Sequence, residues 1–236
     1  MLYTLLKGQL TFETAVMQIL AVLLIIFLIL PFHEWAHAFA ASCLGDKGIK
    51  YRGRLSLNPL SHIDPAGALC MLLFGFGWAK PVPVDARYFK KPKIGMAVTA
   101  LAGPLANIVA AFAGCLIFYG IVGFSPISFL LGDVWGYINI FLSYYIVCNI
   151  SLAVFNLIPV PPLDGSKILF AFLPDNIVYK ICRYQQYYIL IIFALLFVGV
   201  LNVPINFLEN GILGFLQWIC KSIFGLFGAN YGLVTA

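Results

Sequence analysis

Two histidines and a glutamate, within five residues of one another, form the first group in this chain that could carry out chemistry. The sequence reads HEWAH over residues 33–37, directly after an apolar run over residues 16–32. Side chains four residues apart share one face of a helix, so His33 and His37 can bind one zinc ion together. Glu34 would then lie beside the metal and accept a proton from its bound water. Ionisable side chains are costly next to lipid, which favours a function over a chance match.

A catalytic zinc site needs three protein ligands and one open position. The candidates for the third ligand are His62, Asp64, Asp85, Asp164 and Asp175. Asp164 follows the third long apolar run, in a proline-rich break that places it at the same end of the bundle as His37. An aspartate followed by a glycine also suits the cap of the next helix. Spacing alone therefore leaves ligand and cap as equal interpretations of Asp164.

The elements that position these residues belong in a membrane. The chain has 236 residues, of which 62% are hydrophobic and 10% are charged. Soluble domains are about 45–50% apolar and about 25% charged. This composition argues against a soluble enzyme, a disordered chain and a disulfide scaffold, and the six cysteines are scattered singly. We expect an all-α membrane protein, a multi-pass helical bundle of about five or six spans.

Apolar runs predict where the helices lie. The first helical pattern extends from Phe12 to Leu44 and ends near Gly45, with Pro31 inside it, where we expect a kink just before His33. Its length of about 50 Å exceeds the roughly 30 Å of hydrocarbon, so it must tilt or extend into protein and water. Further apolar runs cover residues 94–123, 134–158, 187–201 and 205–227. The last of these either crosses the membrane or lies in its interface.

A small β element and a re-entrant segment are expected between the first two long runs. Residues 47–63 are basic and alternate in polarity, which predicts a short strand or hairpin and then a turn. The apolar stretch 67–79 has 13 residues, too few to span comfortably, and basic residues flank both its ends. It is therefore expected to enter the membrane and return to the same face. Residues 80–84 must be extended, because each proline disfavours helix at the residue before it.

Basic residues predict the orientation of the chain. Twelve of the fourteen lysines and arginines lie within residues 45–93 and 166–186. Basic loops stay in the cytoplasm, so we expect both blocks, the β element and the active site to be accessible from that side. The net charge of +5 does not indicate nucleic acid binding, because no basic run alternates with aromatic residues.

Three motifs make the chain resemble the site-2 protease family of intramembrane zinc metalloproteases. They are HEWAHA at 33–38, GPLAN at 103–107 and NLIPVPPLDG at 156–165. The chain further resembles the short branch of that family through NPLSHIDPAG at 58–67 and FGWAKPVPVD at 76–85. The match covers about residues 30–165 in order and content, with no PDZ-like or nucleotide-sensing domain expected.

The resemblance implies a zinc metalloendopeptidase with one zinc ion per chain. It implies His33, His37 and Asp164 as the metal ligands and Glu34 as the general base. We expect residues 1–236 to form a single integral membrane metalloprotease domain. Its catalytic core would cover about residues 12–165, and additional spans would lie within 184–228.

The resemblance also makes two buried amides candidates for binding the substrate. Asn156 would hold the substrate backbone or its oxyanion, and Asn107 corresponds to a family position near the same cleft. Hydrogen bonding between helices is the alternative for both. For His62 and Asp64 a contact to the metal site and a simple loop turn remain open, with the turn favoured.

The function this implies is cleavage of the transmembrane segments of membrane protein substrates near the cytoplasmic side, as in regulated intramembrane proteolysis. The expected setting is a prokaryotic cell membrane, with the lipid bilayer and membrane proteins as partners. The extended residues 47–57 and 80–85 would pair with an unwound substrate as an added strand. The alternatives are a membrane zinc or cation transporter and a catalytically silent family member. Substrate identity and oligomeric state are left open.

Overall fold

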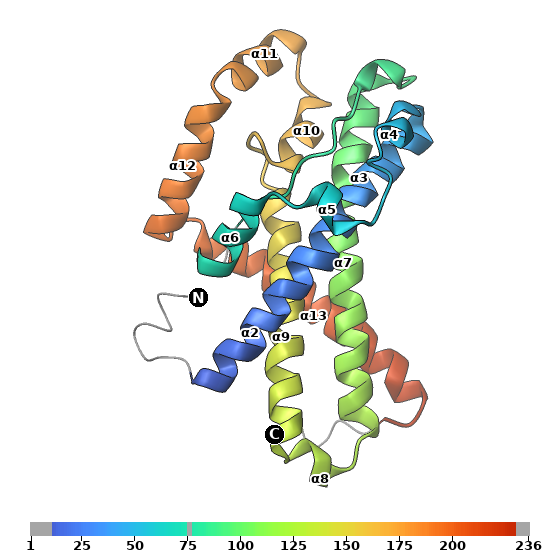
Figure 1. The fold of residues 1–236 in the computed structure, drawn as a ribbon, viewed down its shortest axis with the longest axis vertical. Helices are drawn as coiled ribbons and strands as arrows, with labels where there is room; N and C mark the ends of the chain where they lie inside the picture. Colours follow the sequence, from blue (N-terminus) through green and yellow to red (C-terminus); the bar gives the residue numbers. More distant parts are fainter. Residues whose placement is uncertain (1–10, 75–76, 230–236) are drawn as a thin grey trace.

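The computed structural model describes residues 11–74 and 77–229, which form a bundle of α-helices (Figure 1). Three helical stretches are long and apolar enough to cross a membrane, judged by length and composition. They are Phe12–Leu44, Pro92–Phe124 (α7) and Asp133–Asn156 (α9). The expected helical membrane fold is thus confirmed, whereas the number of five or six spans stays a prediction.

The first span consists of three consecutive helical segments. These are α2 (Phe12–Leu24), a π-helical turn η1 (Ile25–Ile29) and α3 (Leu30–Leu44). The N–H of Leu30 donates to the carbonyl of Ile25, five residues back rather than the four of an α-helix. Pro31, the second residue of α3, has no N–H to donate to the preceding turn. The irregularity expected at the proline therefore lies one turn earlier, as a wider turn.

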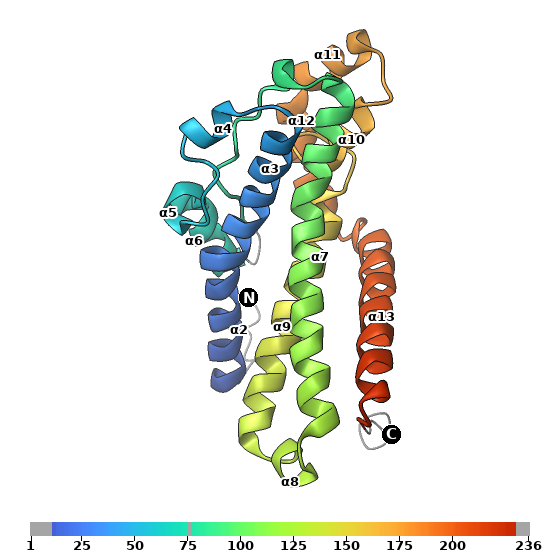
Figure 2. The same ribbon diagram turned by 90° about the vertical axis from the view of Figure 1, so that its right-hand side faces the viewer.

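Helices α7 and α9 run antiparallel and are joined at one end by α8 (Ile127–Leu130) (Figure 2). Small residues let the two helices approach closely. A Cβ atom on Gly114 of α7 would lie only 2.9 Å from side-chain atoms of Tyr145 and Ile146 on α9. Helix α2 packs across α9, while α3 packs along α7. The metal-binding motif at 33–37 therefore faces the first half of α7.

Short helices replace the β element that the sequence predicts after the first span. Helix α4 (Gly48–Tyr51) occupies the start of residues 47–63, and α5 (Pro59–His62) occupies the end. The carboxylate of Asp46 accepts the N–H of Gly48 at 3.1 Å, which favours a turn over an extended chain. The predicted strand or hairpin is not confirmed, since the described residues contain one isolated bridge and no strand.

The chain doubles back after α6 (Pro65–Phe74), as expected for a re-entrant segment. Ile63, before this helix, forms an antiparallel bridge with Ala79, and the N–H of Lys80 donates to the carbonyl of His62 at 2.7 Å. Residues 80–85 that follow are neither helix nor strand. These contacts bring the two ends of the stretch together, while its re-entrant course in a membrane stays a prediction.

The remaining helices surround the end of the bundle at which α7 begins. A 3₁₀ turn, η2 (Ala86–Tyr88), precedes α7, and α10 (Asp164–Phe170), α11 (Asp175–Arg183) and α12 (Gln185–Val198) follow α9 (Figure 1). The last helix, α13 (Asn202–Leu226), lies alongside α7 and α9 (Figure 2). Helices α12 and α13 cover the last two predicted runs but are not among the three candidate spans.

Candidate metal centre

Two histidines of α3 face a glycine of α7. His33 and His37 are buried, and a Cβ atom on Gly103 would lie 2.6 Å from Cε1 of His33 and 2.5 Å from Cε1 of His37. These separations are shorter than a carbon–carbon contact allows. The imidazoles can therefore occupy these positions only because residue 103 has no side chain.

The third group of the centre comes from the chain break after α9. Asp164 is the first residue of α10, and its Oδ2 atom lies 3.0 Å from Nε2 of His37 and 3.4 Å from Nε2 of His33. The two Nε2 atoms are 3.0 Å apart. Leu163, not Asp164, is the cap residue of α10. Of the two interpretations that spacing leaves open, the geometry favours ligand.

This trio fits a zinc ion by donor type and by spacing. Ligand atoms at about 2.0–2.1 Å from a tetrahedral zinc lie about 3.3–3.4 Å from one another. The three observed separations are 3.0, 3.0 and 3.4 Å, with all three residues buried. Two imidazole nitrogens and one carboxylate oxygen are a usual donor set for catalytic zinc. The trio leaves room for a fourth ligand such as water.

Helix α7 also determines which ring nitrogen of each histidine is free. Nδ1 of His33 lies 2.5 Å from Oδ1 of Asn107, and Nδ1 of His37 lies 2.7 Å from the carbonyl oxygen of Thr99. Both partners are hydrogen-bond acceptors, so each imidazole donates from Nδ1 and keeps its lone pair on Nε2. Thr99, Gly103 and Asn107 are spaced by four residues and share one face of α7. That single face thus orients both metal ligands.

The carboxylate of Glu34 is held by the segment that follows the doubled-back chain. Glu34 is buried, and its Oε2 accepts the N–H of Val82 at 3.1 Å. In the sequence Pro81-Val82-Pro83 this is the only backbone N–H, since proline has none. The contact places the predicted general base between the metal ligands of α3 and residues 80–85.

A buried aspartate fixes the other end of residues 80–85. Asp46 is fully buried, and its carboxylate accepts the N–H of Asp85 at 2.9 Å and a guanidinium N–H of Arg52 at 3.0 Å. Its third partner is the N–H of Gly48. Together with the Lys80 hydrogen bond at the start of the segment, this network ties residues 80–85 to α3 through the loop after it.

Lys167 contacts the second oxygen of Asp164. Its Nζ lies 3.0 Å from Oδ1, while Oδ2 faces the two histidines. The ammonium group of Lys167 favours the ionised form of Asp164 through its positive charge and its hydrogen bond. The carboxylate is therefore charged, as a metal ligand must be.

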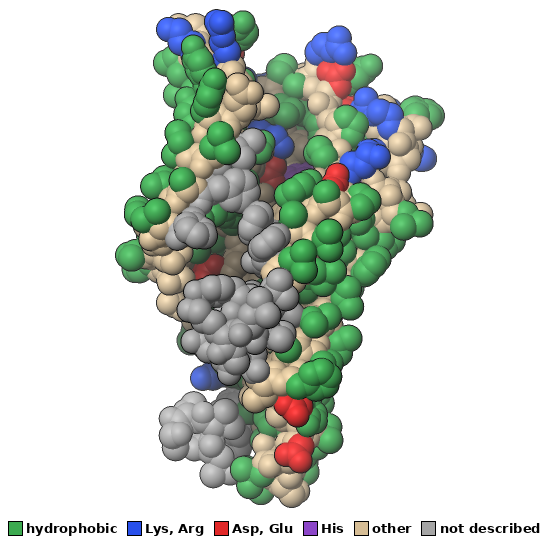
Figure 3. All heavy atoms as spheres, turned by 60° about the vertical axis from the view of Figure 1, so that its left-hand side comes forward, with side chains coloured by type: hydrophobic (Ala, Val, Ile, Leu, Met, Phe, Trp, Pro, Cys, Tyr) green, Lys and Arg blue, Asp and Glu red, His purple; other side chains and the backbone are tan. Residues whose placement is uncertain are grey.

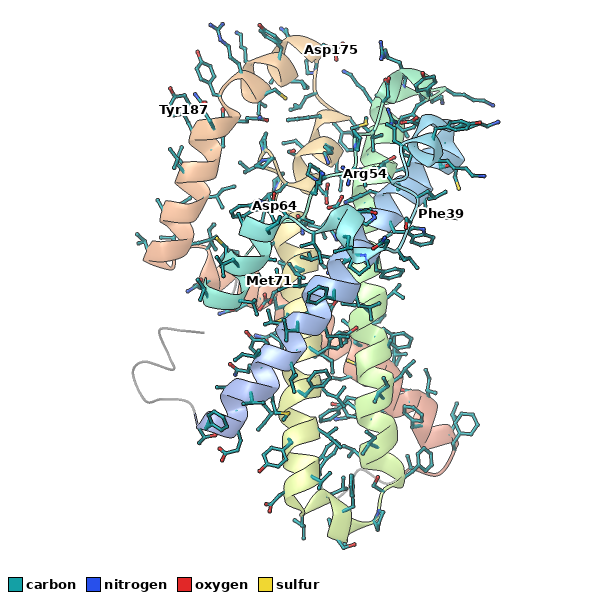
Figure 4. All side chains as sticks on the ribbon, viewed as in Figure 1. Phe39, Arg54, Asp64, Met71, Asp175 and Tyr187 are labelled. Carbon is teal, nitrogen blue, oxygen red and sulfur yellow. The ribbon has the colours of Figure 1, made fainter. Side chains whose placement is uncertain are left out.

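The other candidate ligands lie outside the trio. His62 is buried with Nε2 2.7 Å from the carbonyl of Ser56, and Asp64 caps α6 by accepting the N–H of Gly67 at 2.9 Å. Asp85 pairs with Arg87, whose hydrogen bonds lower the pKa of that partly exposed carboxylate to about 2. Figure 4 shows Asp64 beside α6 and Asp175 on α11, at separate places in the molecule.

The two asparagines occupy different surroundings. Asn107 is fully buried against His33, and its Nδ2 has no hydrogen-bond partner among the described residues. Asn156, the last residue of α9, is half-buried and donates from Nδ2 to the carbonyl of Leu152 within its own helix, at 2.9 Å. A role of either amide in substrate binding stays a prediction.

One face of the molecule is hollowed near the end where the charged loops lie (Figure 3). In Figure 3 a histidine side chain is visible there, between the arm formed by α11 and α12 and the short helices α4–α6, with acidic and basic side chains beside it. Most of the basic side chains in that view gather around the same end of the molecule. The metal centre is therefore close to the end where the charged loops lie.

Sequence reasoning did not find Thr99, Val82, Asp46 or Lys167 as parts of this centre. Thr99 and Val82 act through backbone atoms, which the identity of a side chain does not reveal. Lys167 carries a readable signal, because it lies one helical turn after Asp164.

Two histidines and an aspartate around one position, with a glutamate next to the first histidine, in a bundle of membrane-length helices, define a membrane metalloprotease that uses zinc. Residues 21–199 match the family model of peptidase family M50. The chain belongs to this family, that of the site-2 proteases, and the resemblance inferred from its motifs is confirmed.

Relatives with established names are consistent with this assignment. The chain is 40% identical over 182 residues to YwhC of Bacillus subtilis, named as a zinc metalloprotease, covering 74% of this chain and 80% of the relative. It is 31% identical over 180 residues to Rip2 of Mycolicibacterium smegmatis, with the same kind of name, covering 72% and 64%. MJ0611 of Methanocaldococcus jannaschii, also so named, is 36% identical over 105 residues, 44% of this chain and 48% of that protein. No solved structure matches the chain significantly.

Proposed function

We propose that this metalloprotease is an intramembrane endopeptidase that cleaves transmembrane segments of membrane proteins, with its active site reached from the cytoplasm. The observation that carries the proposal is the buried trio of His33, His37 and Asp164 at 3.0–3.4 Å, whose two histidines lie on a helical stretch of membrane-spanning length. Ionisable groups at such a position are costly unless they serve a function.

The orientation rests on the basic residues. From His37 to the end of α3 at Leu44 there are seven residues, so the centre lies about 10 Å from that end. The part of the chain from the end of α3 to the first turn of α7 carries nine of the fourteen basic residues, from Lys47 to Lys93. Basic loops stay in the cytoplasm, so water would reach the centre from that side.

The chemistry follows from the residues around the trio. Zinc held by His33, His37 and Asp164 would lower the pKa of water and polarise the carbonyl of the peptide bond. Glu34 takes the proton from that water and later gives it to the leaving amine, so no net proton is consumed at its carboxylate. Asn107 and Thr99 keep both imidazoles in the tautomer that binds metal.

Substrate contact is proposed for residues 80–85 and for the two asparagines. Residues 47–57, the other segment expected to pair with the substrate, are helical at Gly48–Tyr51 and are therefore not proposed as a substrate-binding strand. Pro81 and Pro83 offer only carbonyl oxygens, so Val82 provides the backbone N–H within residues 81–83. A substrate strand or a water molecule would have to replace the hydrogen bond between Val82 and Glu34. The unpartnered Nδ2 of Asn107 and the amide of Asn156 would bind substrate carbonyls.

The test is Glu34→Gln in the purified protein. The amide is nearly isosteric with the carboxylate but cannot move the proton, so zinc content should stay at about one per chain while cleavage of a helical membrane substrate stops. Mass spectrometry of proteins that co-purify with this variant would identify trapped substrates. Full cleavage by the variant would disprove the general-base role, and zinc flux by the wild type in vesicles would favour a transporter instead.

A further inference from the structure

The two oxygens of Asp164 have different partners. Oδ2 points to Nε2 of His33 and His37, at 3.4 and 3.0 Å, and Oδ1 lies 3.0 Å from Nζ of Lys167. Among the described residues, Lys167 is the hydrogen-bond partner found for Oδ1. One oxygen is thus directed to the metal position and the other is occupied by a cation.

A lysine three residues after an aspartate usually forms a weak pair on a helix surface. Here the side chain of Asp164 is 8% exposed while that of Lys167 is 40% exposed. The contact is therefore made at a buried carboxylate, where a charge-assisted hydrogen bond is stronger than in water. Lys93 is engaged elsewhere, with Asp175 at 2.9 Å and the carbonyl of Leu173 at 2.8 Å.

A carboxylate can bind a metal through one oxygen or through both. If both oxygens of Asp164 bound zinc, the second would fill the position that the attacking water needs. The hydrogen bond from Lys167 competes for Oδ1 and so favours binding through Oδ2 alone. This consideration applies only if the trio binds zinc as proposed above.

We propose that Lys167 is a positioning residue, which keeps Asp164 as a one-oxygen ligand and thereby keeps the fourth position of the zinc open. Lys167 acts through Asp164 and takes no proton in the reaction. Lys167 lines a cavity of about 210 Å³ together with Met96, Phe170 and Val178. Its replacement by methionine therefore preserves volume and apolar contact and removes only the charged group.

The experiment compares Lys167→Met, Lys167→Gln and Lys167→Arg in the full-length protein. Zinc affinity is measured by competition with a chelator, and coordination number by the visible absorption of the cobalt-substituted protein. The methionine variant has no donor, and the glutamine variant has an uncharged donor on a side chain one bond shorter, so both should lose zinc affinity by about tenfold or more. Their cobalt absorption should weaken toward that of five-coordinate ions. The arginine variant, which can donate to Oδ1, should behave as the wild type in both measurements.

Kinetics at saturating zinc provide a second readout. With the fourth position blocked, kcat of Lys167→Met should fall while KM for the substrate stays constant, because substrate binding is untouched. Lys180→Met, an exposed lysine of α11, is the matched control and should change nothing. Helicity and melting temperature of the metal-free variants show whether they fold, and Lys167→Gln replaces Lys167→Met if the latter does not.

Two outcomes overturn the inference. One is wild-type zinc affinity and a wild-type cobalt spectrum in a folded Lys167→Met or Lys167→Gln protein. The other is a defect that Lys167→Arg does not rescue. A wild-type protein that binds no zinc would instead disprove the proposed function, so the two failures are distinguishable.

Discussion

At the scale of single residues, the metal centre depends on which ring nitrogen of each histidine is free to bind the metal. His33 and His37 donate from Nδ1 to acceptors on α7, which leaves Nε2 of each ring directed to the trio. Gly103 lies between these two acceptors along the same face of the helix. The ligand geometry is therefore set as much by α7 as by the motif that carries the ligands.

Gly103→Ala should impair zinc binding. The new methyl group would overlap the imidazoles of His33 and His37, which cannot move away without losing their hydrogen bonds to α7. We expect zinc affinity to fall at least tenfold and stability to fall by about 1–3 kcal/mol from overpacking. Metal analysis after dialysis against a chelator, with thermal unfolding in detergent, measures both effects.

Gly136→Ala on α9 is the matched control for this change. A Cβ atom there meets no other atom within 4 Å, so the variant should retain zinc and should unfold at or above the wild-type temperature. Wild-type zinc affinity in Gly103→Ala would show that the imidazoles do not depend on the close approach of α7.

Residue types and spacing were enough to predict His33, Glu34 and His37, because a helix period alone brings two imidazoles together. The choice of Asp164 needed the order of the motifs as well, and the structure places its carboxylate beside both rings. Asn107 was predicted as a substrate amide, but its oxygen is occupied by His33. A contact across 74 residues of sequence is not readable from spacing.

At the scale of elements, residues 80–85 are the segment whose placement matters most for the site. Three backbone N–H groups hold this segment, from Lys80, Val82 and Asp85. The last of them depends on the buried carboxylate of Asp46. The segment is thus held over Glu34 by partners from the first span and the loop after it.

Asp46→Ala should loosen residues 80–85 without removing zinc. The change deprives the N–H groups of Asp85 and Gly48 of their acceptor, which costs about 1–3 kcal/mol for buried groups. We expect faster proteolytic cleavage of the loop before α7 and reduced peptidase activity, with zinc content unchanged because no metal ligand is touched. Limited proteolysis and metal analysis of the same preparation check both parts.

Asp85→Ala separates the backbone of this segment from its side chain. The N–H of residue 85 makes the contact to Asp46, whereas the side chain pairs with Arg87 at the surface. This variant should therefore match the wild type in proteolysis and in activity. If Asp46→Ala is as resistant as Asp85→Ala, the carboxylate of Asp46 does not hold the segment.

The three long helices were predictable because each long apolar run also follows the period of a helix. The β element was not, since the alternation over residues 51–57 competes with a turn that the carboxylate of Asp46 initiates at Gly48. Alternation predicts a strand only where no side chain offers the backbone another hydrogen bond. The approach of Ile63 to Ala79 is consistent with a stretch too short for a span.

At the scale of the whole molecule, the centre and the charged loops share one end of the bundle. In Figure 4 the labelled Asp175 marks that end, and α8 lies at the opposite end. The first span and α7 each have 33 residues, longer than a bilayer requires, and both extend into this charged end. In the proposed orientation, the excess length would carry the charged end of both helices beyond the hydrocarbon, and water would reach the centre from that end.

Labelling of single cysteines tests the proposed orientation. In a protein whose six native cysteines have been replaced, Asp175→Cys should resist an impermeant thiol reagent added outside intact cells. Asp133→Cys, at the exposed start of α9, should react. Both should react equally after the membrane is opened. Protection of residue 133 with labelling of residue 175 would reverse the orientation and place cleavage near the outer face.

The π-helical turn at Ile25–Ile29 changes the direction in which side chains point along the first span. Each extra residue rotates a helix by about 100°, so the wider turn lets α2 present one face to α9 while α3 presents another to α7. Deletion of the exposed Phe27 would remove this change of direction. Either the apolar face of α2 would then turn away from α9, or the metal ligands of α3 would turn away from α7. Such a protein should lose zinc or unfold, whereas Phe27→Ala, which keeps the residue count, should do neither. The half of the span that packs on α9 and the half that carries the histidines are thereby oriented separately.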